Sequence, residues 1–272
     1  RIVGIDGESA IGMTRADAPK KLRGPKGTEV FLDVARRGMP EVLKFRIVRD
    51  DIPITTIDAA YKIDDTTAYL KVNRFAQNTM PEFYETLVKL GKVESIILDL
   101  RGNGGGLLDQ GVMMSGFFLP KGAEIVSMDG MRIDKEDFKN PLNGAFMSGR
   151  LIILVDDYSA SASEIVAGAV QDWDRGVVIG RRTFGKGLVQ RQYSLLDGSA
   201  VRITVAKYFT PTGRAIQRPY EKGMKDDYYQ SYVQQLNAED ESQVGDTLQV
   251  YKTLKLGKTV YGGGGIYPDI YV

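Results

Sequence analysis

The sequence contains neither cysteine nor histidine among its 272 residues. The lack of cysteine excludes a disulfide framework, a thiolate nucleophile and a cysteine-based metal site. The lack of histidine excludes Ser-His-Asp and Cys-His catalysis and the usual zinc sites. Any acid–base chemistry must therefore use Asp, Glu, Lys, Tyr or Ser side chains.

Charge of one sign and long apolar runs are also lacking. There are 36 Lys and Arg residues against 35 Asp and Glu residues, which gives a formal net charge of +1. Nucleic-acid binding needs a basic excess or a basic patch, so this balance argues against such a partner. No segment approaches the roughly 18 consecutive apolar residues that a membrane-spanning helix requires. With 43% hydrophobic residues, the chain is long enough for one large domain or two smaller ones.

The first part of the sequence has the pattern of a small domain. Its alternating and helical segments are Arg1–Asp6, Thr14–Leu22, Glu29–Arg36 and Val42–Arg49. Pro19 should shorten the helix. The first strand is already under way at Arg1 and no signal-peptide pattern precedes it, so we expect the sequence to begin within a domain. Residues 50–53 are the expected exit from this unit.

The remainder predicts a mixed α/β domain. Short apolar or alternating runs predict strands over Ala68–Val72, Ser95–Leu100, Leu151–Val155, Gly176–Gly180, Leu188–Ser194 and Ala200–Lys207. Helices are expected over 79–90, 108–118 and a segment that ends near Trp173. Residues 219–247 are polar, and we expect an insertion with a short helix there.

Ser161 is the candidate nucleophile. It lies in Ser159–Ile165, between a predicted buried strand and a predicted helix. The free N–H groups of a helix N-terminus stabilise negative charge at such a position. The spacing from Ser161 to Glu164 is also that of a capping box, so a purely structural role stays open on this evidence alone.

Lys186 is the candidate base. A hydroxyl is a poor nucleophile without a base, and in the absence of histidine the remaining candidate is a lysine that burial deprotonates. Desolvation can supply the roughly 4 kcal/mol that such a change in a lysine requires. Gly185 and Gly187 flank Lys186 and allow close backbone approach. The alternative is an ordinary solvated lysine.

The same segment offers a nucleotide-binding reading, which we disfavour. Residues 180–187 have the GxxxxGK pattern, but Gly187 stands where a phosphate-binding loop needs Ser or Thr. The segment that follows predicts a strand where that motif needs a helix. The glycines of 102–106 do not complete GxGxxG either, because Leu107 occupies the third glycine position.

Four motifs occur in a fixed order: Asp99–Gly106, Ser159–Ile165 with Gln171 and Asp172, Thr183–Gly187 with Val189 and Gln190, and Tyr208–Gln217. Together they resemble the carboxyl-terminal processing proteases, also called tail-specific proteases. Gly265–Val272 fits that family, and Gly7–Thr28 looks like the second half of its PDZ domain. The 219–261 stretch is similar to the version found in Bacteroidetes-like bacteria.

This resemblance implies a crotonase-like α/β sandwich protease core over residues 50–272, preceded by a partial, N-terminally truncated PDZ domain over 1–49. It implies a serine endopeptidase that cleaves proteins or peptides selected by their C-terminal region. It implies no metal, cofactor, nucleotide or nucleic acid, leaves a homo-oligomer open, and suggests a periplasmic or cell-envelope location.

The resemblance also assigns roles to residues: Ser161 as nucleophile, Lys186 as base, Gln190 as the group that orients the lysine, and the backbone N–H groups of Ala162 and Gly105 as the oxyanion hole. Asp172 matches a supporting acid of some members. A carboxylate near a helix C-terminus is unfavourable, so we expect Asp172 to have a partner.

Two departures from the family pattern stand out. Gly104 occupies a position where the family commonly has Pro, which loosens the oxyanion loop, and Pro19 interrupts the helix that should flank the peptide groove. The rival interpretation is a catalytically inactive peptide-binding module with the same fold. The presence of Ser161, Lys186 and Gln190 together argues against it.

Overall fold

A computed structural model describes residues 1–51, 55–219 and 249–272. The chain forms two compact units, Arg1–Ile54 and Thr55–Val272, so the division lies close to the exit expected at residues 50–53. The predicted insertion at 219–247 falls almost entirely outside the described residues. No helix in the described ranges is long and apolar enough to cross a membrane.

The first unit is a small antiparallel sheet with one short helix. The strand order is β2-β1-β3-β4, with bounds Ile2–Ile5 for β1, Glu8–Ser9 for β2, Glu29–Val34 for β3 and Leu43–Val48 for β4. Helix α1, Ala18–Leu22, is shorter than predicted and carries Pro19 in its first turn, where a missing N–H costs nothing. Ile5, Val30 and Leu32 form the buried core of this first unit.

The second unit contains a six-stranded sheet in the order β16-β11-β10-β7-β6-β5. The strands are β5 Ile57–Lys62, β6 Thr67–Val72, β7 Ser95–Asp99, β10 Arg150–Val155, β11 Val177–Gly180 and β16 Ile270–Tyr271. Only β5 pairs in the antiparallel sense, and the other neighbours are parallel. The apolar runs of β7 and β10 fit such a buried parallel sheet.

A four-stranded antiparallel sheet in the order β12-β13-β8-β9 forms a second layer. The strands are β8 Glu124–Gly130, β9 Ile133–Lys139, β12 Leu188–Ser194 and β13 Ala200–Phe209. Strands β14, Val250–Lys252, and β15, Thr259–Tyr261, form a separate pair. The mixed α/β class expected from the sequence is therefore confirmed.

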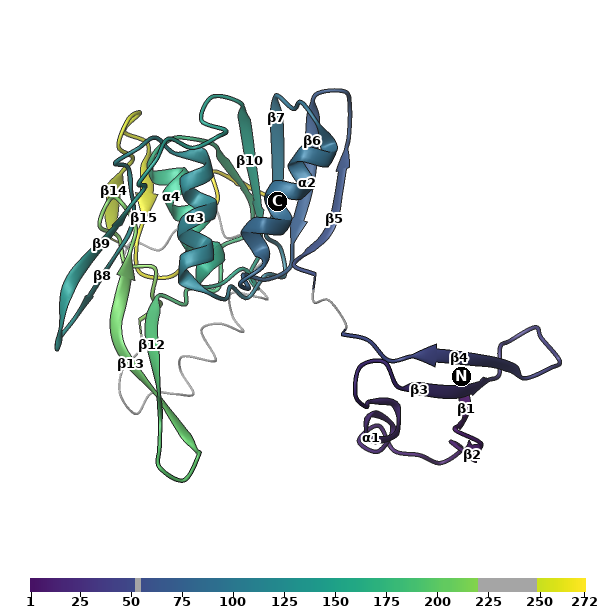
Figure 1. The fold of residues 1–272 in the computed structure, drawn as a ribbon. Coiled ribbons are helices and arrows are strands. Elements are labelled where there is room, and N and C mark those ends of the chain that lie inside the picture. Colours follow the sequence, from purple (N-terminus) through teal and green to yellow (C-terminus); the bar gives the residue numbers. More distant parts are fainter. Residues whose placement is uncertain (52–54, 220–248) are drawn as a thin grey trace. The chain divides into compact units, whose positions relative to one another are not determined.

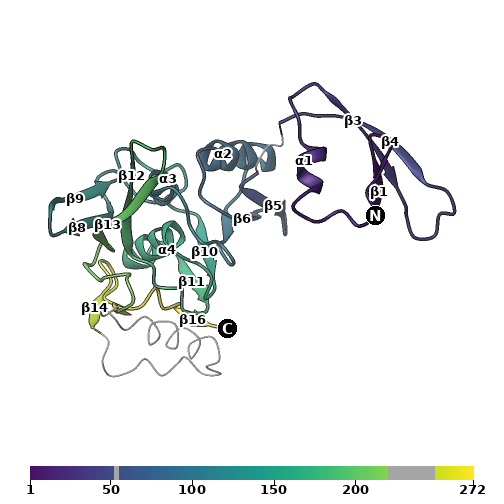
Figure 2. The ribbon, with the colours of Figure 1, turned by 90° about the horizontal axis from the view of Figure 1, so that it is seen from below.

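Helices α3, Leu108–Phe118, and α4, Ala162–Asp172, lie between the two large sheets (Figure 1). The view from below shows α4 in the same middle position (Figure 2). Every residue of α4 is buried, as a helix covered on both sides must be. Helix α2, Thr79–Leu90, has the predicted bounds and ends at Gly91, whose φ is 73°.

The parallel strands bring two motif loops to one edge of the sheet. Strands β7 and β10 are neighbours and run in the same direction, so the segments that follow them, 100–106 and 156–161, leave from the same edge. Ligand sites of open α/β sheets form at this carboxyl edge.

Candidate active site

Ser161 lies at the sharp turn between β10 and α4. Its backbone has φ 57° and ψ −114°, an unusual conformation for a residue with a side chain. Holding such a residue costs about 1–3 kcal/mol, and strain of this kind clusters at functional sites. A strand–turn–helix with a strained serine at the turn is the way α/β-hydrolases expose a nucleophile.

Glu164, in the first turn of α4, joins the turn of Ser161 to the loop of Lys186. Its Oε2 accepts the N–H groups of Ser161 at 2.8 Å and of Lys186 at 2.9 Å. Its Oε1 accepts the Thr183 hydroxyl at 2.6 Å and the Gly185 N–H at 2.7 Å. Complete burial raises the pKa of the Glu164 carboxyl, against the effect of these four hydrogen bonds.

The main chains of Ser161 and Lys186 therefore meet at one carboxylate oxygen. The Lys186 side chain is exposed, however, which corrects the expectation that burial in the folded chain deprotonates it. Within the described residues, no carboxylate lies within ion-pair distance of Lys186.

Gln190 lies beside a β-bulge between β12 and β13. Val189 pairs with Ala206 and Gln190 pairs with Thr204, so the ladder skips Val205. The extra residue belongs to β13, so β12 keeps its regular alternation. Gln190 therefore lies on the opposite face of β12 from Val189, which packs into the core. Gln190 itself remains exposed.

The glycine loop after β7 lies directly against the turn of Ser161. At Gly105, φ is +90°, and an added Cβ would stand 2.5 Å from the Ala160 oxygen and 2.7 Å from Ser161 Cβ. The Gly105 N–H, expected to serve the oxyanion hole, donates to Asn103 Oδ1 at 2.9 Å. Gly104 is exposed and has nothing within 4 Å of such a Cβ.

Asn103 is a buried residue that the sequence reasoning did not single out. Its backbone oxygen accepts the Ala160 N–H at 3.0 Å and the Ser163 hydroxyl at 2.9 Å. Its side-chain amide donates to the Val72 oxygen at 2.9 Å. Asn103 thus joins the glycine loop to both the turn of Ser161 and strand β6. The only sequence signal was its place between two glycines.

Asp172 has the partner that its position required. It forms a fully buried ion pair with Arg214, and its Oδ2 accepts the N–H and hydroxyl of Thr212 at 3.0 and 2.8 Å. Arg214 also donates to Gln171 at 2.7 Å. These contacts anchor the loop after β13 to the end of α4. None of these contacts joins Asp172 to Ser161 or Lys186.

Asp99, at the end of β7, holds Arg101 and Tyr69 beside the glycine loop. Arg101 donates from two nitrogens, at 2.9 and 2.6 Å, and the Tyr69 hydroxyl donates at 2.6 Å. Although burial acts in the opposite direction, these bonds lower the pKa of the Asp99 carboxyl. The pKa of Tyr69 is raised to about 12, mainly by burial and secondly by the hydrogen bond to Asp99.

The loop that carries Lys186 is supported by the glycine-rich segment near the C-terminus. Thr183 donates its N–H to the Ile266 oxygen at 3.1 Å, and its hydroxyl accepts the Ile266 N–H at 2.7 Å. At Gly265, φ is +93°, and an added Cβ would stand 2.5 Å from the Thr183 oxygen. The glycine-rich loop at 261–266 therefore packs against the loop that carries Lys186.

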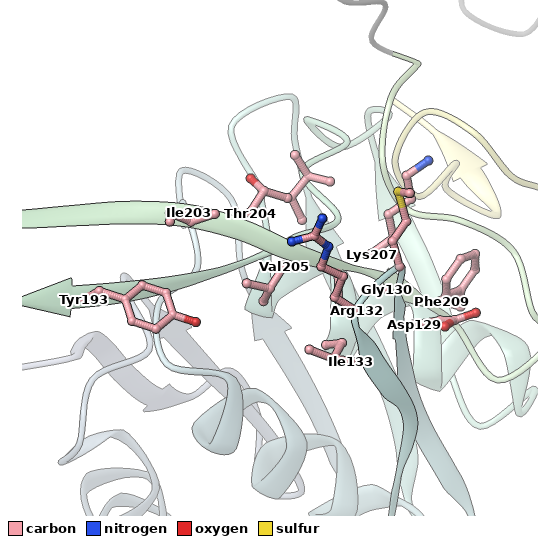
Figure 3. A pocket seen from close by; sticks show the side chains of 13 residues that line it. Asp129, Gly130, Arg132, Ile133, Tyr193, Ile203, Thr204, Val205, Lys207 and Phe209 are labelled. Atoms are coloured by element: carbon pink, nitrogen blue, oxygen red, sulfur yellow. The ribbon is translucent and has the colours of Figure 1, made fainter.

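A separate pocket lies along β13 and the turn between β8 and β9 (Figure 3). Its lining is mainly apolar and includes Ile133, Leu188, Ile203 and Val205. None of the residues assigned a role above lines it. We therefore treat this pocket as distinct from the candidate active site.

Residues 66–230 match the model of peptidase family S41. The chain belongs to this family. The resemblance drawn from the four motifs is thereby confirmed, because the S41 match spans the glycine loop, the turn of Ser161 and the Lys186 loop. The nucleotide-binding reading of residues 180–187 finds no support in this assignment.

Its S41 relatives include named processing proteases. A carboxy-terminal-processing protease of Bartonella bacilliformis is 38% identical over 220 residues, covering 78% of this chain and 50% of the relative. The carboxy-terminal processing protease CtpA of Bacillus subtilis is 36% identical over 227 residues, covering 83% and 47%. The chain thus spans about half the length of these curated relatives.

Among solved structures, the chain is similar to a photosystem II D1 C-terminal processing protease. The TM-score is 0.57 at 26% sequence identity, and the match covers 100% of this chain and 62% of the other. The two-sheet core with intervening helices is therefore the architecture of an S41 peptidase.

Proposed function

We propose that this chain is the catalytic part of a serine endopeptidase that works with a Ser161–Lys186 dyad. The Ser161 hydroxyl attacks the carbonyl carbon of a substrate peptide bond while the Lys186 amine accepts its proton. Lys186 then gives this proton to the leaving amine. In the second half of the reaction water attacks the acyl-enzyme, and Lys186 takes a proton from the water and returns it to the Ser161 oxygen. This chemistry needs no histidine.

The observation that carries the proposal is the shared hydrogen bonding of Ser161 and Lys186 to Glu164 Oε2. It keeps the base loop against the strained turn of the nucleophile. Because Lys186 is exposed in the free chain, we infer that bound substrate excludes water from it and thereby favours the neutral amine.

We assign supporting roles to three further residues. Gln190 accepts an N–H from the neutral Lys186 amine and orients its lone pair without adding charge. The N–H groups of Ala162 and Gly105 stabilise the oxyanion. The Gly105 N–H must then leave or share Asn103 Oδ1 when the tetrahedral intermediate forms.

We extend the proposal to substrate choice from the names of the relatives, which process carboxyl termini. In this proposal residues 1–49 are the second half of a PDZ domain, residues 50–272 are a crotonase-like core, and substrates are proteins or peptides recognised through their C-terminal region. We also propose a periplasmic or cell-envelope location.

The test combines turnover with active-site labelling. Wild type should cleave an unfolded protein substrate and react at Ser161 with a fluorophosphonate probe. Ser161→Ala should lose both, and Lys186→Arg should lose turnover while keeping its melting temperature, because guanidinium is not a base at neutral pH. Full turnover by Lys186→Arg would remove Lys186 from the mechanism.

A further inference from the structure

We propose that Glu164 is a positioning residue of this active site, a role that rests on the proposed Ser161–Lys186 chemistry. Its side chain is 0% exposed and lies in the first turn of α4. One oxygen holds the nucleophile turn and the base loop together, as described above, and the other holds the base loop alone. The carboxylate thereby fixes the register of Lys186 relative to Ser161.

All four partners of Glu164 act as donors, so the site matches an acceptor-only group. An ionised carboxylate offers acceptors at both oxygens, whereas an amide offers an acceptor at one end and donors at the other. The Thr183 hydroxyl accepts the Ile266 N–H at 2.7 Å, which directs its own proton toward Glu164. A neutral side chain of the same shape cannot satisfy this arrangement.

Helix capping does not account for these contacts. Of the four hydrogen bonds that Glu164 accepts, a capping box includes only the one from the N–H of Ser161. The other three bonds go to Thr183, Gly185 and Lys186, which lie 19 to 22 residues further along the chain. Burying a carboxylate is costly unless it is hydrogen-bonded, and small displacements of a catalytic group lower rates by large factors.

The central experiment is Glu164→Gln in the full chain. The amide oxygen can accept from Ser161 and Lys186, but the amide nitrogen then faces the N–H of Gly185, which loses its acceptor. We expect kcat to fall about 10-fold or more with KM within about 2-fold, as for loss of an interaction that matters in the transition state. The rate of fluorophosphonate labelling at Ser161 should fall in parallel.

Glu82→Gln is the matched control. Glu82 also lies in the first turn of a helix and accepts the N–H and hydroxyl of a threonine distant in sequence, Thr56, both at 2.7 Å. It is outside the candidate site, so its loss should lower the melting temperature and leave kcat unchanged. If Glu164→Gln behaves like this control at a temperature where both are folded, the positioning role is wrong.

A second variant covers the case in which Glu164→Gln does not fold. Glu164→Asp keeps the negative charge, but its side chain is shorter by one methylene group. It therefore cannot bond both the turn of Ser161 and the loop of Lys186, and kcat should fall as well. Wild-type kcat in Glu164→Asp would overturn the proposal. If wild type itself neither cleaves nor labels at Ser161, the dyad chemistry fails, and that result is distinct from either variant outcome.

Discussion

Replacing Gly105 by alanine should damage the candidate active site, because the added methyl group would meet the turn of Ser161. The φ of +90° at Gly105 is unfavourable for an L-residue by about 1–2 kcal/mol. The new Cβ would also stand 2.5 Å from the Ala160 oxygen and 2.9 Å from the Ala162 nitrogen. Relieving such overpacking costs about 1–3 kcal/mol. Together these effects give a destabilisation of about 2–5 kcal/mol.

Thermal unfolding followed by circular dichroism measures this effect. For a unit of this size we expect the melting temperature of Gly105→Ala to fall by roughly 4–20 °C, at about 2–4 °C per kcal/mol. Fluorophosphonate labelling at Ser161, assayed below the melting transition, should slow because the added methyl group displaces the nucleophile turn.

Gly104→Ala is the control for this prediction. It adds the same methyl group one residue earlier, at an exposed position with nothing within 4 Å. Its melting temperature and labelling rate should match those of wild type. Equal behaviour of the two variants would refute the contact between the glycine loop and the nucleophile turn.

Three further predictions concern residues around the site. Gln190→Ala should lower kcat about 10-fold with little change in melting temperature. Gln190→Glu should shift the activity profile toward alkaline pH, because a carboxylate favours the ammonium form of the base. Wild-type profiles for both variants would show that Gln190 has no role in the reaction. Asp172→Asn should destabilise the chain by about 3–5 kcal/mol in denaturant unfolding, because it leaves the Arg214 charge buried and unpaired, and a loss below 1 kcal/mol would contradict this. Because the pKa of Tyr69 is raised to about 12, its hydrogen bond to Asp99 should stabilise the fold fully below pH 10 and lose its effect as pH rises toward 12. The difference in unfolding free energy between wild type and Tyr69→Phe should therefore shrink over that range, and a constant difference would rule the linkage out.

The predicted elements agree with the structure where local signals were strong. Helix α2 has the expected bounds and ends at Gly91, although its N-cap is Asn78 and makes no side-chain capping bond. Helix α3 has the bounds expected after the glycine loop. Strand β9 gave no signal, because most of its residues are exposed and charged, as an edge strand allows. Strand β8 was not predicted either, although four of its seven residues are buried.

The candidate site was predictable only in part. The motifs identified Ser161 and Lys186, but the exposure of a lysine depends on residues distant in sequence, and here the argument from burial was wrong. Glu164 looked like a capping residue, since its other partners come from a loop that sequence spacing does not connect to it. The position of Asp172 near a helix C-terminus indicated that it needs a partner, but nothing in the sequence indicated that the partner is Arg214.

The complete burial of α4 has a consequence for how such an enzyme can be controlled. The serine sits at the end of a helix whose residues all pack into the central layer, so its turn cannot shift without opening the core. Amide hydrogens in the middle of α4 should accordingly exchange only when the whole unit unfolds. Lys186, by contrast, is exposed, although Gly185 and Gly187 on either side of it are buried. In the proposed mechanism, a ligand or partner that switches activity therefore acts on the exposed side chain of Lys186, while the turn of Ser161 stays fixed.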